Sequence, residues 1–413
     1  MTAAQHGDLP VITDVAREAG VSYQTVSRVI NASGPVRAST RARVLAAIEV
    51  LGWSPNEAAQ SLSRRRTVPE TPGAETPGAE APGAVRPVLV SAAPGPTPAS
   101  LDGTADVDET TPAGAGDDAP AGGTRPSSLV LVTGGSGKLG RATVDHLLAE
   151  GHRVVVVDLV APHRPGVPWT RADLTDPGQA LEVLSGIDDR WERPDAVVHL
   201  AAIPAPGLLP DATLFATNIT TTYNVFAAAR RVGITEVVWA SSETVLGLPL
   251  DVPPPSFPLD EETGPTPTTS YSLSKTLEEE MARQFARWCP EMKLVGLRLS
   301  NVMADEDYAA FPSFDADAAL RRWNGWSYID ARDAARAISA GLRHPDRGAD
   351  VFVIANGDTV MSRPTAELAA LEFPGVPVHC EVGQHTALMS TEKARRVLGW
   401  VPAHTWRDHV PGR

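Results

Sequence analysis

The chain has 413 residues, of which 42% are hydrophobic, and a formal net charge of −14 at pH 7. This length suffices for two or three domains, and the hydrophobic content supports a sizeable core. Two cysteines exclude a disulfide framework and a CxxC metal motif, so no metal site is predicted. No apolar run reaches the ~18 residues of a membrane span, and the chain does not open with a signal-peptide pattern. We therefore expect a cytoplasmic protein without membrane contact.

A charge imbalance separates the first 66 residues from the rest of the chain. Residues 1–66 contain eight arginines and five acidic residues, which gives +3, whereas the remaining residues together carry −17. A basic head on an acidic body is expected when only the head contacts nucleic acid.

Residues 67–127 show no sustained periodicity. They contain the repeat ETPGAETPGAEAPGA at residues 70–84 and are rich in Pro, Gly, Ala, Thr and Asp. Such a composition buries too little apolar surface to offset the entropy of ordering, so this segment is predicted to be a disordered linker.

Residues 11–66 alternate short helical patterns with turns. Thr13 is suited to cap a helix from Asp14 to Ala19, Ser22 is suited to cap a second, and a third is expected from about Ser39. The second helix would turn apolar side chains toward a core and polar ones outward: Val21, Val26 and Val29 inward, and Tyr23, Gln24 and Arg28 outward. Because Gln suits adenine and Arg suits guanine in the major groove, this helix is predicted to read bases.

The stretches VITDVAREAGVSYQTVSRVIN (residues 11–31) and STRARVLAAIEVLGWSPNEAAQSL (residues 39–62) closely resemble the DNA-binding domain of the lac repressor family. The resemblance implies a small all-α helix-turn-helix domain over residues 1–66 that binds double-stranded DNA at a palindromic operator. The implied DNA contacts are Ser22, Tyr23, Gln24, Arg28 and Asn31, with Ala59 and Leu62 on a minor-groove hinge helix. The sugar-binding core through which that family dimerises has no counterpart after residue 66.

From Ser128 the pattern changes to apolar strands that alternate with amphipathic helices. Five strand-like runs are SLVLVTGG, HRVVVVDLV, DAVVHLAA, ITEVVWASS and KLVGLRLSN. This alternation predicts an α/β domain over residues 128–413, a Rossmann-type doubly wound parallel sheet with a small C-terminal substrate lobe.

The first of these strands leads into a glycine-rich loop with the spacing of a dinucleotide-binding turn. The predicted cofactor-binding loop residues are Gly134, Gly137, Lys138, Leu139 and Gly140. Asp158 ends the next strand, where a carboxylate accepts hydrogen bonds from ribose hydroxyls and repels a 2′-phosphate. NAD is therefore predicted over NADP, although Lys138 could attract a phosphate.

A tyrosine and a lysine four residues apart, Tyr271 and Lys275, share one face of a predicted helix. Ser241 and Ser242 end a strand at the ligand-binding edge of the sheet. The pKa of a tyrosine, near 10, is too high for a base at neutral pH, but a nearby ammonium favours the phenolate. Tyr271 is predicted to exchange a proton with a substrate hydroxyl while NAD exchanges hydride with its carbon, and a serine holds the same oxygen.

These motifs, with ADLTD, HLAA, NITTTYN, SSETVLG and LRLSNV, resemble the extended short-chain dehydrogenase/reductase family of NAD-dependent sugar epimerases and dehydratases. The resemblance implies Ser242, rather than Ser241, with Tyr271 and Lys275 as the catalytic set. Tyr271 and Lys275 would also contact the cofactor, and Ser242 the substrate. The other implied positions are Asp173 and Leu174 at the adenine, Ala201 and Ala202 along the cofactor, Asn218 behind the site and Asn301 at the substrate.

The substrate stays open between a free sugar and a nucleotide sugar, and the net reaction between oxidation, epimerisation and dehydration. Arg298, Arg321 and Arg322 are candidates for binding an anionic substrate group. That family commonly pairs through two long helices, for which residues 211–231 and 272–288 are candidates, so a homodimer is expected.

Three functions agree with this combination of motifs. The chain is predicted to be a DNA-binding transcriptional regulator fused to a catalytically competent NAD-dependent sugar oxidoreductase or epimerase. The alternatives are a pure regulator whose NAD- and sugar-binding domain acts as a sensor, and an enzyme with a vestigial DNA-binding head. The intact Ser/Tyr/Lys set argues against the first alternative, and the intact recognition helix argues against the second.

Overall fold

The structure is a computed structural model that describes residues 12–21, 25–26, 29, 38–51, 128–186, 192–379 and 383–409. The predicted linker at residues 67–127 lies outside these ranges, and the bounds of the three predicted segments stay predictions. In the described part of the chain, no helix is long and apolar enough to cross a membrane.

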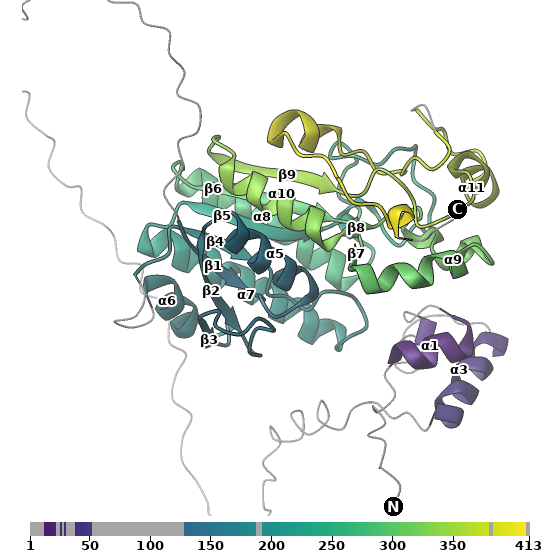
Figure 1. Cartoon of the computed structure of the whole chain (residues 1–413), viewed down its shortest axis with the longest axis horizontal. Helices are drawn as coiled ribbons and strands as arrows, with labels where there is room; N and C mark the ends of the chain where they lie inside the picture. The colour runs from purple at the N-terminus through teal and green to yellow at the C-terminus, as the bar shows by residue number, and fades with distance from the viewer. Residues whose placement is uncertain are drawn as a thin grey trace, which may run out of the picture. The chain divides into compact units, whose positions relative to one another are not determined.

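A seven-stranded parallel sheet forms the centre of the body (Figure 1). In spatial order its strands are β3 (Trp169–Arg171), β2 (Arg153–Asp158), β1 (Leu129–Thr133), β4 (Ala196–His199), β5 (Glu236–Ser242), β6 (Lys293–Leu299) and β9 (Gly348–Ile354). The order of the strands reverses between β1 and β4. In a doubly wound sheet the carboxyl ends of the strands at such a reversal open the crevice where ligands bind.

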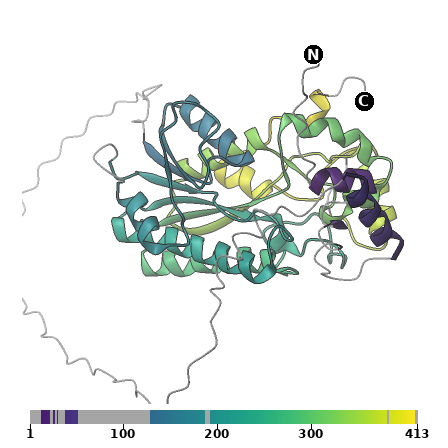
Figure 2. The same ribbon diagram turned by 90° about the horizontal axis from the view of Figure 1, so that it is seen from below.

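Helices cover both faces of this sheet (Figures 1 and 2). Helices α5 and α10 pack together on one face, whereas α6, α7 and α8 pack side by side on the other. Their bounds are α5 (Lys138–Ala149), α6 (Pro177–Ser185), α7 (Asp211–Val232), α8 (Ser270–Trp288) and α10 (Ala331–Arg343). Because both faces are covered, every residue of β1 and β4 is buried, which explains their continuous apolar runs. The predicted doubly wound fold is confirmed, with two more strands in the sheet than the five predicted.

A smaller lobe lies beyond the carboxyl edge of the sheet (Figure 1). It contains the two-stranded pair β7 (Val302–Met303) and β8 (Ile329–Asp330), with helices α9 (Phe311–Phe314) and α11 (Thr365–Glu372). The short helical turns of the body are η1 (Glu243–Leu246), η2 (Asp305–Ala310), η3 (Ala318–Leu320), η4 (Arg322–Asn324), η5 (Ala394–Leu398) and η6 (Trp406–Asp408). The core of the lobe is rich in buried aromatic side chains: Phe257, Tyr308, Phe311, Trp326, Tyr328, Phe373 and Trp406.

The head contributes two described helices, α1 (Ile12–Ala19) and α3 (Ala38–Leu51). They form a small core with two valines of the segment between them: Val15, Ala19, Val26, Val29, Val44 and Ala47. Val26 and Val29 therefore face inward as predicted. The predicted cap is wrong, because Thr13 lies inside α1; a threonine also fits the first turn, so its presence alone does not mark the start.

The predicted DNA contacts of the head lie outside the described residues. They are Ser22, Tyr23, Gln24, Arg28, Asn31, Ala59 and Leu62.

Candidate active site

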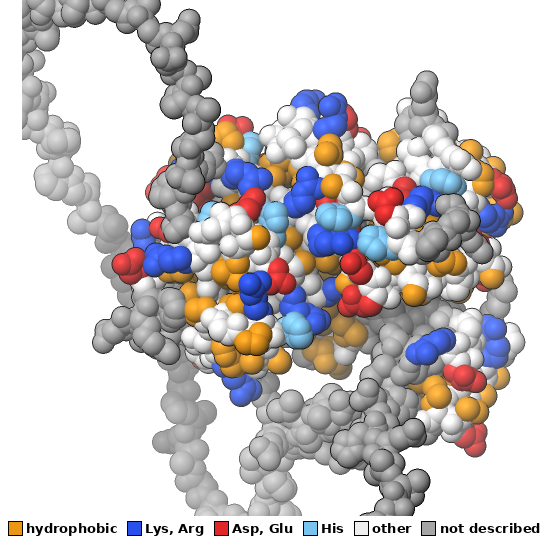
Figure 3. Space-filling model, in the orientation of Figure 1, with side chains coloured by type: hydrophobic (Ala, Val, Ile, Leu, Met, Phe, Trp, Pro, Cys, Tyr) orange, Lys and Arg blue, Asp and Glu red, His pale blue; other side chains and the backbone are white. Residues whose placement is uncertain are grey.

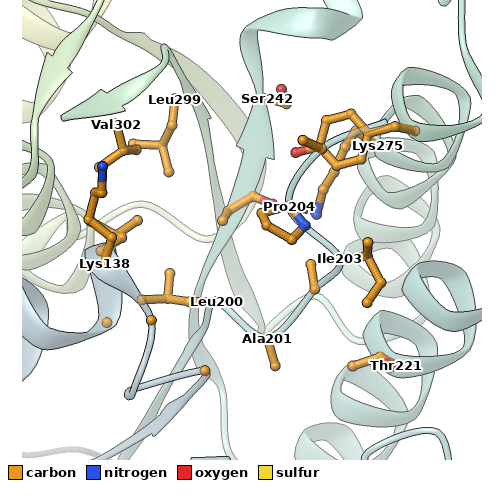
Figure 4. Close-up of a pocket in the computed structure, with 18 of the residues that line it drawn as sticks. Lys138, Leu200, Ala201, Ile203, Pro204, Thr221, Ser242, Lys275, Leu299 and Val302 are labelled. Atoms are coloured by element: carbon orange, nitrogen blue, oxygen red, sulfur yellow. Dashed lines mark hydrogen bonds between the residues drawn. The ribbon is translucent and has the colours of Figure 1, made fainter. Parts of the chain in front are cut away.

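A cavity of about 810 Å³ opens at the carboxyl edge of the sheet, within the size range of small-molecule sites. It is lined by the predicted cofactor and catalytic residues: Gly134, Gly137, Lys138, Leu139, Gly140, Asp158, Asp173, Leu174, Ala201, Ala202, Ser242, Tyr271, Lys275 and Asn301. Figure 4 shows Lys138 on one side of this cavity and Ser242 and Lys275 on the other. The fold thus brings together residues that are more than half the body apart in sequence.

The glycine-rich loop between β1 and α5 has no room for a side chain at two positions. Gly134 has a φ of 69°, and a Cβ there would lie 2.7 Å from the backbone nitrogen of Ala201. A Cβ on Gly140 would lie 2.2 Å from the Gly134 oxygen, so α5 packs directly against the loop. Helix α5 begins at the cavity with Lys138, and the unpaired N–H groups and dipole of a helix amino terminus favour an anion such as a pyrophosphate. The loop therefore fits a dinucleotide.

Asp158, at the end of β2, is held by backbone N–H groups. Its Oδ2 accepts from the Ser136 nitrogen at 2.9 Å, and its Oδ1 accepts from the Val160 nitrogen at 3.2 Å. The Ser136 hydroxyl donates to the Val160 oxygen at 2.6 Å, which ties the glycine-rich loop to the chain after β2. The carboxylate is thereby fixed in the wall of the cavity that Asp173 and Leu174 also line.

Tyr271 and Lys275 are positioned by α8, whose start is fixed by a capping box. Thr269 Oγ1 accepts from the Ser272 nitrogen at 3.0 Å, and Ser272 Oγ accepts from the Thr269 nitrogen at 2.9 Å. Tyr271 consequently stands in the first turn and Lys275 one turn later, so both line the cavity. They are only 7% and 3% exposed.

The Lys275 ammonium is held by two acceptors inside the protein. Its Nζ donates to the Ala240 oxygen and to Glu278 Oε2, each at 2.9 Å. Because an ammonium has three hydrogens, one remains for a ligand. The sequence analysis did not predict Glu278. The sequence feature that could have indicated it is its position three residues after Lys275, in a run of three glutamates.

The pKa of Tyr271 lies above its usual value. Burial is the largest cause, because it disfavours the charged phenolate, and the Glu278 and Glu243 carboxylates act in the same direction. Lys275 and the Ser242 hydroxyl lower the pKa of Tyr271. The expected effect of Lys275 is therefore present, but burial outweighs it.

The two serines at the end of β5 have different partners. Ser241 donates to Glu279 Oε1 at 2.6 Å, and Arg298 binds both oxygens of Glu279 at 2.9 Å. Ser242 lines the cavity, and its hydroxyl favours the phenolate of Tyr271. The geometry thus places Ser242 with Tyr271, as the resemblance implied. Arg298 is buried in its pair with Glu279, so it does not match the expected role of an anion ligand.

Asn301 lines the cavity on the side of the lobe. Its Oδ1 accepts from Arg321 Nη1 at 3.3 Å, so its Nδ2 is the group that can donate to a ligand. Burial lowers the pKa of Arg321 to about 10. Arg322 donates to the Leu250 oxygen at 2.7 Å. Neither guanidinium lines the cavity, so their positions do not support direct contact with an anionic substrate group.

Glu243 directly follows Ser242 and was also missed by the sequence prediction. Its buried carboxyl accepts from Ser300 Oγ at 2.5 Å and from Asn324 Nδ2 at 3.1 Å. Burial raises the pKa of Glu243 to about 7, although both hydrogen bonds oppose the rise. The wall of the cavity therefore contains a carboxyl group that titrates near neutral pH.

Buried polar contacts hold the backbone beneath the cavity. His199 contacts Thr133 Oγ1 through Nδ1 at 2.8 Å and Thr222 Oγ1 through Nε2 at 3.2 Å. Burial lowers the pKa of His199 to about 3, so the imidazole is neutral. Asn218 binds both the nitrogen and the oxygen of Ile203, at 2.8 and 3.1 Å, which is the supporting position that the resemblance implied.

Comparison with known proteins gives matches for both parts of the chain. Residues 130–355 match the NAD dependent epimerase/dehydratase family, and residues 11–56 match the bacterial regulatory proteins of the lacI family. Both predicted resemblances are thereby confirmed.

The relatives of the body include UDP-glucose 4-epimerases. The chain is 28% identical over 316 residues to that of Rhizobium leguminosarum bv. trifolii, covering 67% of this chain and 93% of the relative. It is 31% identical over 327 residues to one of Cyamopsis tetragonoloba, covering 66% and 90%. The crystal structure of the Thermus thermophilus UDP-glucose 4-epimerase complex with NAD has a TM-score of 0.50 at 24% identity, covering 67% and 94%. This last similarity shows the shared fold.

Proposed function

The chain belongs to the NAD dependent epimerase/dehydratase family, and we propose that it is a sequence-specific transcriptional regulator fused to an active sugar oxidoreductase or epimerase. The observation that carries the enzymatic half is one cavity lined by the glycine-rich loop, Asp158, Ser242, Tyr271 and Lys275. These residue types supply a cofactor cradle, a ribose ligand and a proton-transfer group within a single site.

NAD would be held by the wall of the cavity that the glycine-rich loop forms. The loop admits a pyrophosphate at the start of α5, and Asp158 would accept from the ribose hydroxyls and disfavour the extra phosphate of NADP. Asp173 and Leu174 would flank the adenine, and Ala201 would line the path of the cofactor. When bound, NAD supplies the acceptor for a hydride that leaves a substrate carbon.

The residues of the chain would move the accompanying proton. Tyr271, as phenolate, would take the proton of a substrate hydroxyl while the hydride leaves the carbon that bears it. Ser242 would hold the same oxygen, and the free hydrogen of Lys275 would stabilise the phenolate. In an epimerisation Tyr271 returns this proton when hydride returns to the other face of the carbon. In an oxidation Tyr271 would instead release this proton to solvent.

The relatives favour nucleotide sugars as the substrate class. They are UDP-glucose 4-epimerases, and the match covers about nine-tenths of their length. Asn301 Nδ2 would donate to an oxygen of the substrate, because Arg321 occupies the carbonyl end of the amide. A free sugar is the alternative, since no cavity-lining arginine marks a phosphate contact among the described residues.

The enzymatic half is tested with the full chain and a panel of UDP-sugars and free sugars. Interconversion of two epimers without net consumption of NAD supports an epimerase, and accumulation of NADH supports a dehydrogenase. A protein that binds NAD but converts no member of the panel would favour the sensor alternative. A protein that binds no NAD would contradict the proposal altogether.

We assign DNA recognition to the head, because residues 11–56 match the lacI family. The head would act on DNA in the cytoplasm. On the face of the body that carries α5 and α10, acidic, basic and histidine side chains are mixed (Figure 3). Ion pairs there include Arg336–Asp333 at 2.7 Å and Arg343–Glu150 at 2.9 Å. A mixed face attracts a phosphate backbone only weakly. Selection of DNA sequences by the full chain decides between a regulator and an enzyme with a vestigial head.

A homodimer would supply the two heads that a palindromic operator requires. Four large apolar side chains on α7 and α8 are 38–49% exposed: Tyr223, Leu273, Leu277 and Trp288. Leu273 and Leu277 are one turn apart on α8, so they share a face. An apolar face that a helix leaves exposed is a candidate for an interface. We place the dimer contact on these two helices. Light scattering should give twice the chain mass of 43.6 kDa, and a monomer would contradict this part of the proposal.

A further inference from the structure

A buried carboxyl group, Glu278, lies behind Lys275 and takes no part in the proton transfer described above. It is fully buried, and its Oε2 accepts from Lys275 Nζ at 2.9 Å. Among the described residues no hydrogen bond of regular geometry reaches its Oε1, although the Thr222 hydroxyl is close enough to favour the charged form. Burial raises the pKa of Glu278, and Lys275 and Thr222 oppose that rise. A carboxylate in the interior is costly, and an oxygen without a well-formed hydrogen bond adds to that cost. Such a group calls for an explanation in function.

The next residue, Glu279, shows how a structural carboxylate is satisfied on the same helix. Arg298 binds both of its oxygens at 2.9 Å, and Ser241 donates to Oε1 at 2.6 Å. Glu279 therefore joins α8 to β5 and β6. The hydrogen bond of Glu278 leads instead to Lys275, which lines the cavity.

The charge of Glu278 acts on Tyr271 in the sense opposite to that of Lys275. The ammonium lowers the pKa of Tyr271, whereas the Glu278 carboxylate raises it. The other charged or titratable groups that act on these three residues are Glu279 on the same helix, Glu243 at the start of η1 and His199 on β4. His199 is neutral, and Glu279 is neutralised by Arg298. Glu278 is therefore the carboxylate paired directly with the catalytic lysine.

We propose that Glu278 is a positioning residue that anchors Lys275 and offsets its charge, so that Tyr271 keeps its proton up to a higher pH. This inference rests on the proposed function. The charge of Glu278 would favour the neutral form of Tyr271 before substrate binds. The neutral tyrosine is the form that donates a proton to a carbonyl oxygen. To take the proton of a substrate hydroxyl, Tyr271 must first become a phenolate. The negative charge of Glu278 would oppose that ionisation.

The test is an ultraviolet difference titration of the tyrosines in the full chain. The Tyr271→Phe protein serves as the reference, so that the difference reports on Tyr271 alone. In Glu278→Gln the amide oxygen still accepts from Lys275 but the negative charge is gone. We expect the midpoint of Tyr271 to fall by about one pH unit, as for the removal of a nearby like charge.

Two further variants distinguish the electrostatic effect of Glu278 from a structural one. Glu280→Gln removes the same charge two residues further along α8, where the side chain is half exposed and pairs with Arg283 at 2.7 Å, so the midpoint should not move. Glu278→Asp keeps the charge but draws it back from Lys275, so we expect a smaller fall. It also serves as the second variant if Glu278→Gln does not fold.

An unchanged midpoint in both Glu278 variants would overturn the inference, as would an equal shift in the Glu280 control. A purely structural role would lower the melting temperature without moving the midpoint. The titration needs no substrate, so it stands apart from the test of the proposed function. Absence of sugar turnover would refute the enzyme, whereas an unmoved midpoint beside normal turnover would refute only the role of Glu278. Once a substrate is known, the acidic limb of kcat/KM should shift by the same amount.

Discussion

The head and the body of this chain encode their functions in different ways. In the head, five of the seven predicted DNA contacts fall within residues 22–31, so a short run of sequence carries them. In the body, the glycine-rich loop follows β1, Asp158 ends β2, Ser242 ends β5, and Tyr271 and Lys275 stand on α8. Only the parallel sheet brings these side chains into one cavity. The comparison teaches that the two proposed activities would use separate residues, so single substitutions should abolish one and spare the other.

The largest effect is expected from Tyr271→Phe, which removes the proton-transfer group and keeps the ring. Turnover of a sugar should fall by roughly 10²–10⁴, the usual contribution of general acid–base catalysis, while NAD binding and DNA binding stay the same. Steady-state kinetics beside calorimetric titration with NAD provide the measurement. Equal turnover before and after the change would remove Tyr271 from the mechanism.

A pH effect should separate the body from the head in unfolding experiments. The pKa of Glu243 is raised from 4.5 to about 7, so the folded body binds a proton that the unfolded chain releases. Its contribution to stability is therefore fully present below pH 4.5 and is lost as pH rises through about 7. Over this window Glu243→Gln should become more stable relative to the unaltered protein by at most about 3 kcal/mol.

Thermal unfolding between about pH 5 and pH 8 measures this difference. Glu280→Gln, which changes an exposed glutamate, is the control and should follow the unaltered protein. A difference that does not change with pH would show that Glu243 stays ionised in the folded body.

In the head, Gln24→Ala should relax base preference at one position of the operator. Loss of a bidentate contact to a base costs about 1–3 kcal/mol at that base pair and nothing elsewhere in the site. Competition gel shifts with single-base variants of a selected DNA measure it, and sugar turnover should not change. If the unaltered protein binds every DNA sequence equally, the head does not recognise a specific sequence. The contrast drawn between the head and the body would then fail.

The smallest effect is expected at the cofactor wall of the cavity. Asp158→Ala removes the carboxylate predicted to accept from the ribose, so the preference for NAD over NADP should narrow by about tenfold, or roughly 1.5 kcal/mol. Asp145→Ala is the matched control. It removes the same charge from α5, where Asp145 forms an exposed ion pair with Arg164. A clear preference of the unaltered protein for NADP would contradict the assignment of Asp158.

The parts of the body that could be predicted from sequence are those set by local pattern. The continuous apolar runs of β1 and β4 and the spacing of Gly134 and Gly140 need only a few neighbouring residues. The Tyr271–Lys275 spacing is likewise local, since i and i+4 share a face of any helix. For this reason the sequence alone predicts the fold and many of the residues that line the cavity.

The electrostatics of the site could not be predicted in the same way. Glu278, Glu279 and Glu280 form a uniform acidic run that looks like a solvated helix face. The packing of α7, β5 and β6 on α8 buries the first two and leaves the third exposed. The bond of Glu279 with Arg298 spans 19 residues and two elements, and that of Glu243 with Asn324 spans 81. Contacts of this range have no periodic signal in the chain, and they decide the charge around Tyr271.

The measurement that tests the central claim most directly joins the two activities in one molecule. The full chain is captured on beads that carry its selected DNA sequence, washed, and supplied with NAD and the sugar panel. The account predicts that the DNA-bound protein converts a sugar, that Gln24→Ala reduces capture without reducing turnover in solution, and that Tyr271→Phe is captured normally but inactive. Capture that is equal on every DNA sequence, or captured protein that binds NAD yet converts no sugar, would contradict the claim that one chain is both a specific DNA reader and an enzyme.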